Sequence, residues 1–261
     1  MRMIVCMKAV PSTTEVRMDP KTNTIVRDGK QSVVNPFDAA ALEVALQLKE
    51  RLGGHVTALS MGIPDTQCLL RDAIARGADD AMLLSDRAFA GSDTLATSYA
   101  LSLAFGKLNV PADLVLCGKM AVDGDTAQIG PELAGLLGVP CVTSVSEMLE
   151  ATPDHLVVRH DVDGGTETVE VPLPAVLTLT KDVAALRMPS IAGVRAGEAA
   201  EASVLDATAA GANRARCGLD GSPTQVVRSF VPERTNEAVE LSGTPAEQAS
   251  ALLDVFGEAA R

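Results

Sequence analysis

The segment 113–138 holds the residues of this chain that are best suited to bind a ligand. It reads DLVLCGKMAVDGDTAQIGPELAGLLG, an apolar run followed by a polar, glycine-containing loop and a second apolar pattern. Open α/β sheets bind ligands at the carboxyl ends of their strands, and the amides at the start of the next helix can hold a phosphate. Gly124 and Gly130 would let the backbone approach a ligand closely. Thr126 and Gln128 add a hydroxyl and an amide for phosphate or ribose oxygens.

Two carboxylates in the same loop leave the nature of the ligand open. Asp123 and Asp125 would repel a bare phosphate, so they are better suited to cap the helix or to bind ribose hydroxyls. A capped turn between a strand and a helix, with no ligand, explains the same residues about equally well.

A second group of residues could lie at the same edge of the sheet. Asn35-Pro36-Phe37-Asp38 is typical of a helix start, because Asn caps helices and Pro tolerates the first helical position. The capping end of this helix would face the edge that carries Cys6 and Met61, which come at the ends of two apolar runs. These residues could frame an adenine, and a plain helix start with ordinary strand packing remains the alternative.

Several classes of protein and of site are excluded by the rest of the sequence. The GxGxxG, Walker, GxSxG and HExxH signatures are absent, and no nucleophile stands beside a base, so we predict no catalytic residue. The five cysteines and three histidines are scattered, which predicts reduced thiols in a cytoplasmic protein and no metal site. A formal net charge of −12 disfavours nucleic acid as a partner. No apolar run approaches the roughly 20 residues of a membrane helix, so we expect no membrane insertion.

The elements that must position these residues alternate along the first half of the chain. Short apolar runs and longer amphipathic stretches predict βαβ units around a mainly parallel sheet flanked by helices. The predicted elements are strands at 3–10, 55–61, 80–84 and 113–117 and helices at 36–52, 64–76, 93–107 and 126–137, with a hairpin excursion at 13–34.

The second half follows a different pattern. The stretches 156–161 and 166–171 flank Asp163-Gly164-Gly165 and predict a hairpin, and 175–180 predicts one more strand, which together suggest an antiparallel addition to the sheet. No regular pattern is evident from 187 to 240, and a helix is expected at 246–260. We therefore divide the chain into an α/β nucleotide-binding domain, 1–184, and a loop with an extended C-terminal arm, 185–261, that wraps a partner.

Six stretches of the chain, taken in order, resemble the beta subunit of the electron transfer flavoproteins. They are MRMIVCMKAVP, NPFDAAALEVALQLKE, HVTALSMG, RDAIARGADDAMLL, LVLCGKMAVDGDTAQIGPELAGLLGVP and PAVLTLTKDVAALRMPSIAGVRA. The resemblance implies an adenine nucleotide alpha hydrolase-like fold and a partner alpha subunit that carries FAD. It also implies a nucleotide site at the matching positions, which are Cys6, Asn35, Pro36, Phe37, Asp38, Met61, Ala121, Val122, Asp123, Gly124, Asp125, Thr126, Ala127, Gln128, Ile129, Gly130, Pro131 and Glu132.

Two branches of that family differ in the nucleotide that they hold. The respiratory branch carries an acidic residue at the position of Gly124 and binds AMP as a structural group. The loop VDGDTAQIGP resembles the electron-bifurcating branch, in which a second FAD takes this site, and the missing side chain at Gly124 makes room for its pyrophosphate. The resemblance then implies NADH as hydride donor, and electron delivery to a ferredoxin or flavodoxin and to an acyl-CoA or related dehydrogenase. Aromatic residues make up only 2% of the chain, so stacking on a flavin ring would need partner residues.

The resemblance also implies a docking loop for the dehydrogenase at 186–197. Ile191 matches the family's exposed leucine, and it is an apolar but stiffer, β-branched anchor. The usual Asn before this loop is missing and Met188 replaces an aromatic residue, so the dehydrogenase stays open. A surface loop with an incidental Ile is the alternative.

Overall fold

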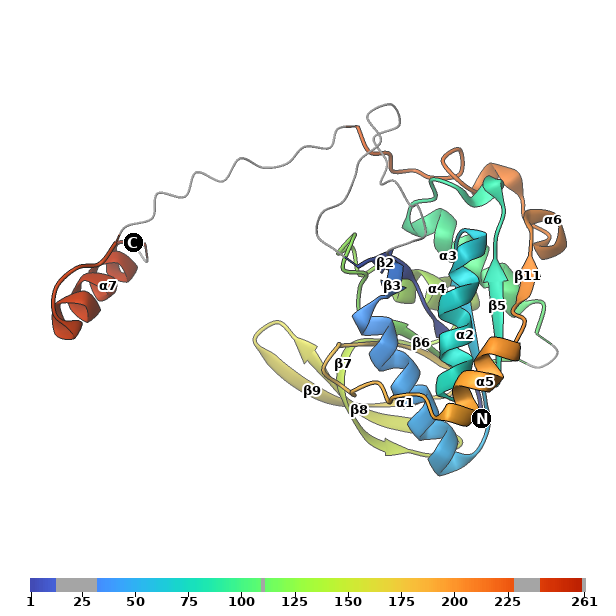
Figure 1. The fold of residues 1–261 in the computed structure, drawn as a ribbon, viewed down its shortest axis with the longest axis horizontal. Helices are drawn as coiled ribbons and strands as arrows, with labels where there is room; N and C mark the ends of the chain where they lie inside the picture. Colours follow the sequence, from blue (N-terminus) through green and yellow to red (C-terminus); the bar gives the residue numbers. More distant parts are fainter. Residues whose placement is uncertain (13–31, 109–110, 228–239, 260–261) are drawn as a thin grey trace. The chain divides into compact units, whose positions relative to one another are not determined.

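The computed structural model describes residues 1–12, 32–108, 111–227 and 240–259, and the chain divides into two compact units, Met1–Val226 and Val227–Arg261. A nine-stranded sheet runs through the first unit (Figure 1). Its strand order is β11 (Ser203–Leu205), β5 (Asp80–Leu84), β4 (His55–Met61), β1 (Arg2–Cys6), β6 (Leu114–Gly118), β10 (Ala175–Leu179), β7 (Cys141–Ala151), β8 (His155–Val162) and β9 (Gly165–Pro172).

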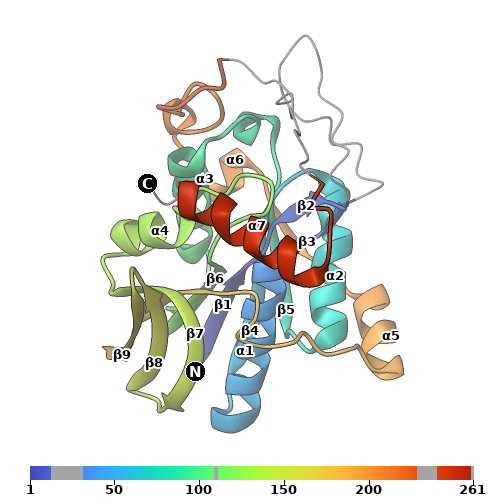
Figure 2. The same ribbon diagram turned by 90° about the vertical axis from the view of Figure 1, so that its left-hand side faces the viewer.

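The sheet is parallel from β11 to β7, and β8 and β9 continue it antiparallel (Figure 2). Strand β1 shows why the centre is buried on both faces. Met3 and Val5 belong to one apolar cluster, whereas Ile4 and Cys6 belong to the other, because alternate side chains of a strand point to opposite faces. The predicted mainly parallel sheet with an antiparallel addition is confirmed.

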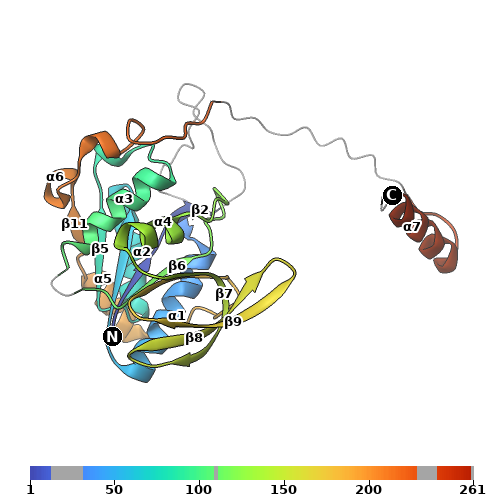
Figure 3. The same cartoon turned by 180° about the vertical axis from the view of Figure 1, so that it is seen from behind.

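Helices cover both faces of this sheet. One face carries α1 (Pro36–Leu52), α2 (Gln67–Arg76) and α5 (Ile191–Ala199), which lie in front in Figure 1. The other carries α3 (Thr94–Phe105) and α4 (Ile129–Leu137), which lie in front in Figure 3. The shorter elements are η1 (Pro64–Thr66), η2 (Arg87–Phe89), α6 (Ala207–Ala210), η3 (Arg214–Arg216) and a separate antiparallel pair, β2 (Ala9–Pro11) and β3 (Ser32–Val34).

Two predicted elements need correction. The strand expected at 3–10 is two strands, because the chain leaves the main sheet after Cys6 and β2 pairs with β3 instead. Most of the hairpin excursion expected at 13–34 lies outside the described residues. The helix expected from Thr126 begins at Ile129, because Asp125 and Ala127 take left-handed φ values of 51° and 54° that no α-helix contains. Strand β7 was not predicted at all.

Part of the expected arm belongs to the main fold. Between 187 and 240 the sequence suggested no regular structure, yet α5, β11 and α6 all lie there. Strand β11 pairs with β5 in parallel and closes one edge of the sheet. The first unit accordingly runs to Val226, beyond the boundary expected at 184.

The second unit contains helix α7 (Pro245–Ala259), close to the predicted range. Thr244 and Glu247 form a reciprocal cap: the Thr244 amide donates to Glu247 Oε2 at 2.7 Å, and the Glu247 amide donates to Thr244 Oγ1 at 3.4 Å. Leu253 and Phe256 are 71% and 63% exposed, so the helix presents apolar side chains outward. Within the described ranges, no helix is both long enough and apolar enough to cross a membrane.

Candidate functional site

The order of the strands places a topological switch point between β1 and β6. From β1 the chain moves outward through α1 to β4 and through α2 to β5, and α3 then carries it back across to β6 on the other side of β1. The connections that follow β1 and β6 therefore diverge at the carboxyl edge of the sheet. In open α/β sheets such a switch point is where ligands bind. We call this place the switch crevice.

Asn35 joins the two walls of the switch crevice. Its side chain does not cap α1, as the sequence suggested. It donates from Nδ2 to the carbonyl of Met120 at 2.9 Å and accepts from the amide of Val122 at 3.3 Å. The residue is 1% exposed, so both bonds are shielded from water. Asn35 thus fixes the loop after β6 to the start of α1.

Asp38 makes the same connection one helical turn further on. Its two carboxylate oxygens accept from the amide of Lys8 at 2.8 Å and from the amide of Gly118 at 3.0 Å. Burial raises the pKa of Asp38 to about 7, against these hydrogen bonds, which act to lower it. A Cβ on Gly118 would lie 2.3 Å from Asp38 Oδ1 and 2.6 Å from Phe37 Cβ, so only glycine lets α1 approach β6 this closely. Pro36, at the start of α1, is exposed.

The loop from Ala121 to Gln128 offers free amide groups to a ligand. In the part of the chain that the structure describes, the amides of Thr126, Ala127 and Gln128 donate to no protein acceptor, and all three residues are exposed. Ala127 is left-handed and Gln128 right-handed (φ −103°, ψ −28°), an alternation that turns successive N–H groups toward one side. Such a nest binds anions, and phosphate is the commonest of them. We call residues 121–128 the nest loop.

One of the two acidic side chains of the nest loop forms an ion pair with a lysine. Lys8 Nζ lies 2.6 Å from Asp123 Oδ1, and the Asp123 side chain is only 8% exposed. The repulsion that Asp123 would exert on a phosphate is therefore offset by the Lys8 ammonium, which lies beside this loop only in the folded chain. Asp125 is exposed and its carboxylate faces water.

Two further predicted residues are occupied by contacts within the protein. Glu132 accepts from Thr94 Oγ1 at 3.0 Å and from Ser98 Oγ at 2.9 Å, which ties the start of α4 to α3. Gly130 is buried, and a Cβ there would lie 2.2 Å from Thr178 Cγ2. Gly130 is therefore accounted for by helix–sheet packing, because Thr178 fills the space beside it. From the sequence we had expected this glycine to let a ligand approach the backbone. The neighbours of Gly130, Ile129 and Pro131, complete the first turn of α4.

Three residues of the site were not predicted from the sequence. Thr94, Ser98 and Lys8 were not singled out as site residues, because each is close to the nest loop only in the folded chain. Thr94 Oγ1 also lies 3.3 Å from Gln128 Oε1. The only local signal was the helix start expected at Ser92 or Asp93, which puts Thr94 in the first turn of α3.

Cys6 and Met61 lie at the same carboxyl edge as the switch crevice. Cys6 ends β1 and is buried, and it is one residue beyond the register pair of Val5 and Leu116. Its thiol therefore lies beside that of Cys117. A hydrogen bond from Cys6, together with burial, raises the pKa of Cys117 well above its usual range, so the Cys117 thiol is protonated near neutral pH. Met61 ends β4 and is partly buried.

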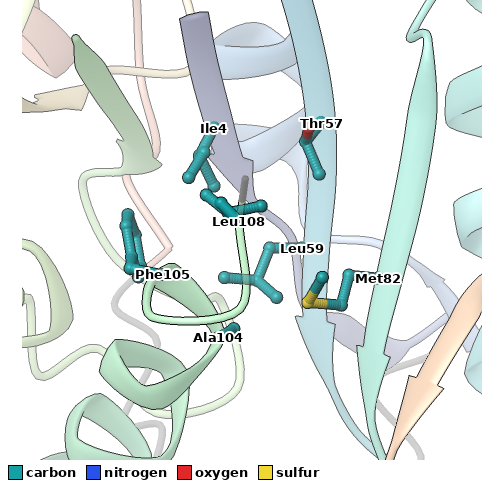
Figure 4. Close-up of a pocket in the computed structure, with 7 residues that line it drawn as sticks. All are labelled: Ile4, Thr57, Leu59, Met82, Ala104, Phe105 and Leu108. Carbon is teal, nitrogen blue, oxygen red and sulfur yellow. The ribbon is translucent and has the colours of Figure 1, made fainter. Parts of the chain in front are cut away.

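A small pocket elsewhere in the fold is not part of this site. It lies on the α3 face of the sheet beneath the end of that helix, and its empty volume is about 160 Å³ (Figure 4). It has no room for a water-sized molecule, so a nucleotide does not fit in it. Its lining is apolar apart from Thr57, and comprises Ile4, Thr57, Leu59, Met82, Ala104, Phe105 and Leu108.

The predicted docking residue lies far from the crevice in the fold, at the start of α5. Ile191 is 79% exposed and Met188 is 84% exposed. Arg187, just before them, is held by a bidentate pair with Glu43 of α1 at 2.9 Å and by a contact with Glu50. The apolar side chains are thus displayed from a fixed base.

Known proteins resemble this chain over nearly its whole length. Residues 22–210 match the family model described as the electron transfer flavoprotein domain. The chain is 42% identical to an electron transfer flavoprotein subunit beta of Thermoanaerobacterium thermosaccharolyticum, over 97% of each chain. It is 41% identical to the caffeyl-CoA reductase-Etf complex subunit CarD of Acetobacterium woodii, over 97% of this chain and 96% of that one. It is 40% identical to protein FixA of Bradyrhizobium diazoefficiens, over 98% of this chain and 91% of that one.

Proposed function

This chain belongs to the electron transfer flavoprotein family, as a beta subunit, and from that membership we propose that its switch crevice holds FAD while the chain is paired with an alpha subunit. The residues that would hold it are those of the nest loop, the start of α1 and the strand ends at Cys6 and Met61. The alternative within the same family is structural AMP in this crevice, with FAD in the alpha subunit alone.

The observation that carries the proposal is the group of three free amides in the nest loop. The amides of Thr126, Ala127 and Gln128 have no protein acceptor among the described residues, and they stand at a switch point between two parallel strands. A pyrophosphate supplies the anionic oxygens that such amides bind. Lys8 reduces the negative potential beside them by pairing with Asp123.

Gly124 favours FAD over AMP. A Cβ built on Gly124 meets no atom of the protein within 4 Å, so the missing side chain leaves free space at the loop surface. A dinucleotide needs such space for its second phosphate and the groups beyond it, whereas AMP ends at the first phosphate. The likeness to a subunit of a caffeyl-CoA reductase complex favours an acyl-CoA-type dehydrogenase as one partner.

The redox chemistry would belong to the cofactor. When bound, FAD supplies hydride acceptance from NADH and one-electron delivery, to a ferredoxin or flavodoxin on one side and through the alpha-subunit FAD to the dehydrogenase on the other. The chain itself would bind the cofactor and orient it. Its described residues place no nucleophile beside a base at the crevice, and Asn35, Asp38 and Glu132 are all engaged in holding the loops.

The alpha subunit is proposed to receive the second unit of this chain. Helix α7 exposes Leu253 and Phe256, and aromatic stacking partners for a flavin are scarce in this chain. Both needs are met by a partner that covers α7 and contributes to the cofactor site. We place the complex in the cytoplasm, since all five cysteines are free thiols.

Counting cofactors in the purified αβ complex tests the proposal. We expect two FAD and no AMP per pair, measured by flavin absorbance and by chromatography of the released nucleotides. One FAD and one AMP per pair would instead support the respiratory alternative, in which the crevice holds structural AMP. One FAD and no adenine nucleotide in the beta subunit would contradict the assignment of the crevice.

A further inference from the structure

The chain leaves the first unit from a segment that is built onto the start of α3. We call residues 217–224 the arm root, because the first unit ends at Val226, two residues later. Within the arm root, the amide of Gly218 donates to Ser92 Oγ at 3.1 Å and the amide of Leu219 donates to the Ala90 carbonyl at 3.1 Å. A Cβ on Gly218 would lie 2.5 Å from the Ala88 carbonyl oxygen, which shows how closely the two segments approach.

Asp93 is the point at which the arm root and α3 are joined. Its Oδ1 accepts from the amide of Ala96 at 3.0 Å and caps α3. Its Oδ2 accepts from Thr224 twice, from the amide at 3.0 Å and from Oγ1 at 2.8 Å. Its own amide donates to Ser222 Oγ at 2.8 Å. Apart from Oδ1, which caps α3, the polar atoms of Asp93 named here form hydrogen bonds with the arm root.

The next residue along the chain connects α3 to the cofactor site. Thr94 donates to Glu132 at 3.0 Å and lies 3.3 Å from the Gln128 side chain, and Gln128 is the last residue of the nest loop. A displacement of Asp93 is transmitted to Thr94 through one peptide unit. The arm root and the nest loop are therefore linked by two adjacent residues of one helix start.

We propose that Asp93 is a positioning residue that couples the arm root to the nest loop, so that the bonds between Asp93 and Thr224 strengthen nucleotide binding in the switch crevice. The coupling rests on the proposed function, because it needs a nucleotide in that crevice. Loss of the Thr224 hydroxyl loosens the start of α3, and Thr94 then holds Gln128 and Glu132 less firmly.

The test uses the complete αβ complex with Thr224→Val, which has nearly the same shape and lacks the hydroxyl. Thr224→Ser restores the hydroxyl. Thr152→Val is the matched control, since Thr152 Oγ1 donates to the carbonyl of His155 at 2.9 Å in the turn between β7 and β8, which belongs neither to the switch crevice nor to α7. FAD and AMP are titrated separately into complex stripped of its beta-site nucleotide, followed by flavin fluorescence and by calorimetry.

We expect Thr224→Val to raise the dissociation constant of the beta-site nucleotide about threefold to tenfold, as loss of one hydrogen bond to a charged acceptor in a linked network would. Thr224→Ser and Thr152→Val should bind as the unaltered complex does, and the alpha-site FAD should be unaffected in all three. Affinity of Thr224→Val within twofold of the unaltered complex would overturn the coupling while leaving the proposed function intact. Equal weakening by Thr224→Ser would also overturn it, and an unaltered complex that binds neither probe would overturn both.

Discussion

Asp38 lies where α1, the end of β1 and the end of β6 meet at the switch crevice. It is 6% exposed and accepts from two backbone amides that belong to different segments. The Asp38 carboxylate therefore bonds two segments of the chain to α1, which neither a helix cap nor a surface acid would do. It holds the two diverging connections at a fixed separation, and its protonation state bears on stability.

The raised pKa of Asp38 predicts that the folded protein loses stability as pH rises toward neutrality. Its pKa is about 7 in the folded chain against 3.8 for the free side chain, so between these values the folded state holds a proton that the unfolded state has released. Stability from this group is complete below about pH 4 and is lost as pH rises through 7. Relative to Asp38→Asn, which cannot ionise, the native protein should lose about 2 to 4 kcal/mol of unfolding free energy over that range. Urea unfolding at pH 5, 6, 7 and 8 measures the part that falls within this window.

A carboxylate of the same helix provides the control. Burial acts to raise the pKa of Glu43, but hydrogen bonds from Arg187 and Gln47 outweigh it and lower the pKa, so Glu43 is ionised throughout pH 5 to 8. Glu43→Gln should therefore differ from the native protein by a constant amount across that window. Parallel curves for Asp38→Asn and the native protein would show that Asp38 does not titrate there.

Gly124→Asp should expel the beta-site FAD and leave the alpha-site FAD in place. The new side chain meets no protein atom within 4 Å of its Cβ, so the fold should tolerate it and the clash should fall on the ligand. Flavin content per αβ pair and the thermal unfolding temperature measure the two effects separately. Gly135→Asp is the control, because Gly135 is also exposed and free of contacts but lies outside the nest loop. Both flavins retained at full occupancy in Gly124→Asp would contradict the steric argument.

At the scale of elements, the packing of α5 on α2 is set by two glycines. A Cβ on Gly193 would lie 2.1 Å from the Ala75 carbonyl oxygen, and one on Gly197 would lie 2.5 Å from the Arg71 carbonyl oxygen. The two helix backbones are therefore in contact, as they are wherever small residues line a helix interface. Together with the ion pairs between Arg187 and α1, this contact holds the start of α5 in place, and Ile191 is exposed there.

Gly197→Ala should destabilise the protein by about 1 to 3 kcal/mol, because the backbone carbonyl of Arg71 cannot move aside as a side chain would. Gly135→Ala should stabilise it by about 0.5 to 1 kcal/mol, since Gly135 lies in helix α4 with no atom within 4 Å of the added Cβ. Urea unfolding of both variants gives the comparison. Equal stability of Gly197→Ala and the native chain would mean that α5 separates from α2 at little cost.

At the scale of the whole molecule, the two units differ in what stabilises them. Both apolar clusters of the sheet consist of residues from the first unit. Helix α7 of the second unit exposes apolar side chains, including Leu252 and Val255 at 45% and 53%. The first unit has a core of its own, whereas the second unit has apolar surface that suits a partner.

A chain that ends after Val226 should fold and should fail to bind the alpha subunit. Its unfolding temperature should lie within about 3 °C of that of the full-length chain, because no core residue is removed. Pull-down with a tagged alpha subunit measures association. Full-length chain with Leu253→Ser and Phe256→Ser separates loss of the apolar face from loss of the whole segment. Normal recovery of the truncated chain would contradict the role proposed for α7.

The sequence by itself determined the repeating βαβ part of the fold. The runs at 55–61 and 80–84 and the helices that follow them were predicted almost to the residue, because a strand buried on both faces and an amphipathic helix each leave a local periodic pattern. Gly124, Thr126 and Gln128 also marked the nest loop as a candidate ligand site without a structure, since a polar loop after an apolar run is a local signal as well.

Only the tertiary structure decided how distant segments use these elements. Strand β11 has three residues and no pattern of its own, and it becomes a strand because β5, about 120 residues earlier, offers it an edge. Strand β7 shifts register twice along β8, which breaks the alternation that would have revealed it. Asn35 bonds to residues more than 80 positions away instead of capping its own helix, and Gly130 makes room for Thr178 instead of a ligand. Each of these outcomes depends on contacts between residues far apart in the chain, and no local pattern encodes them.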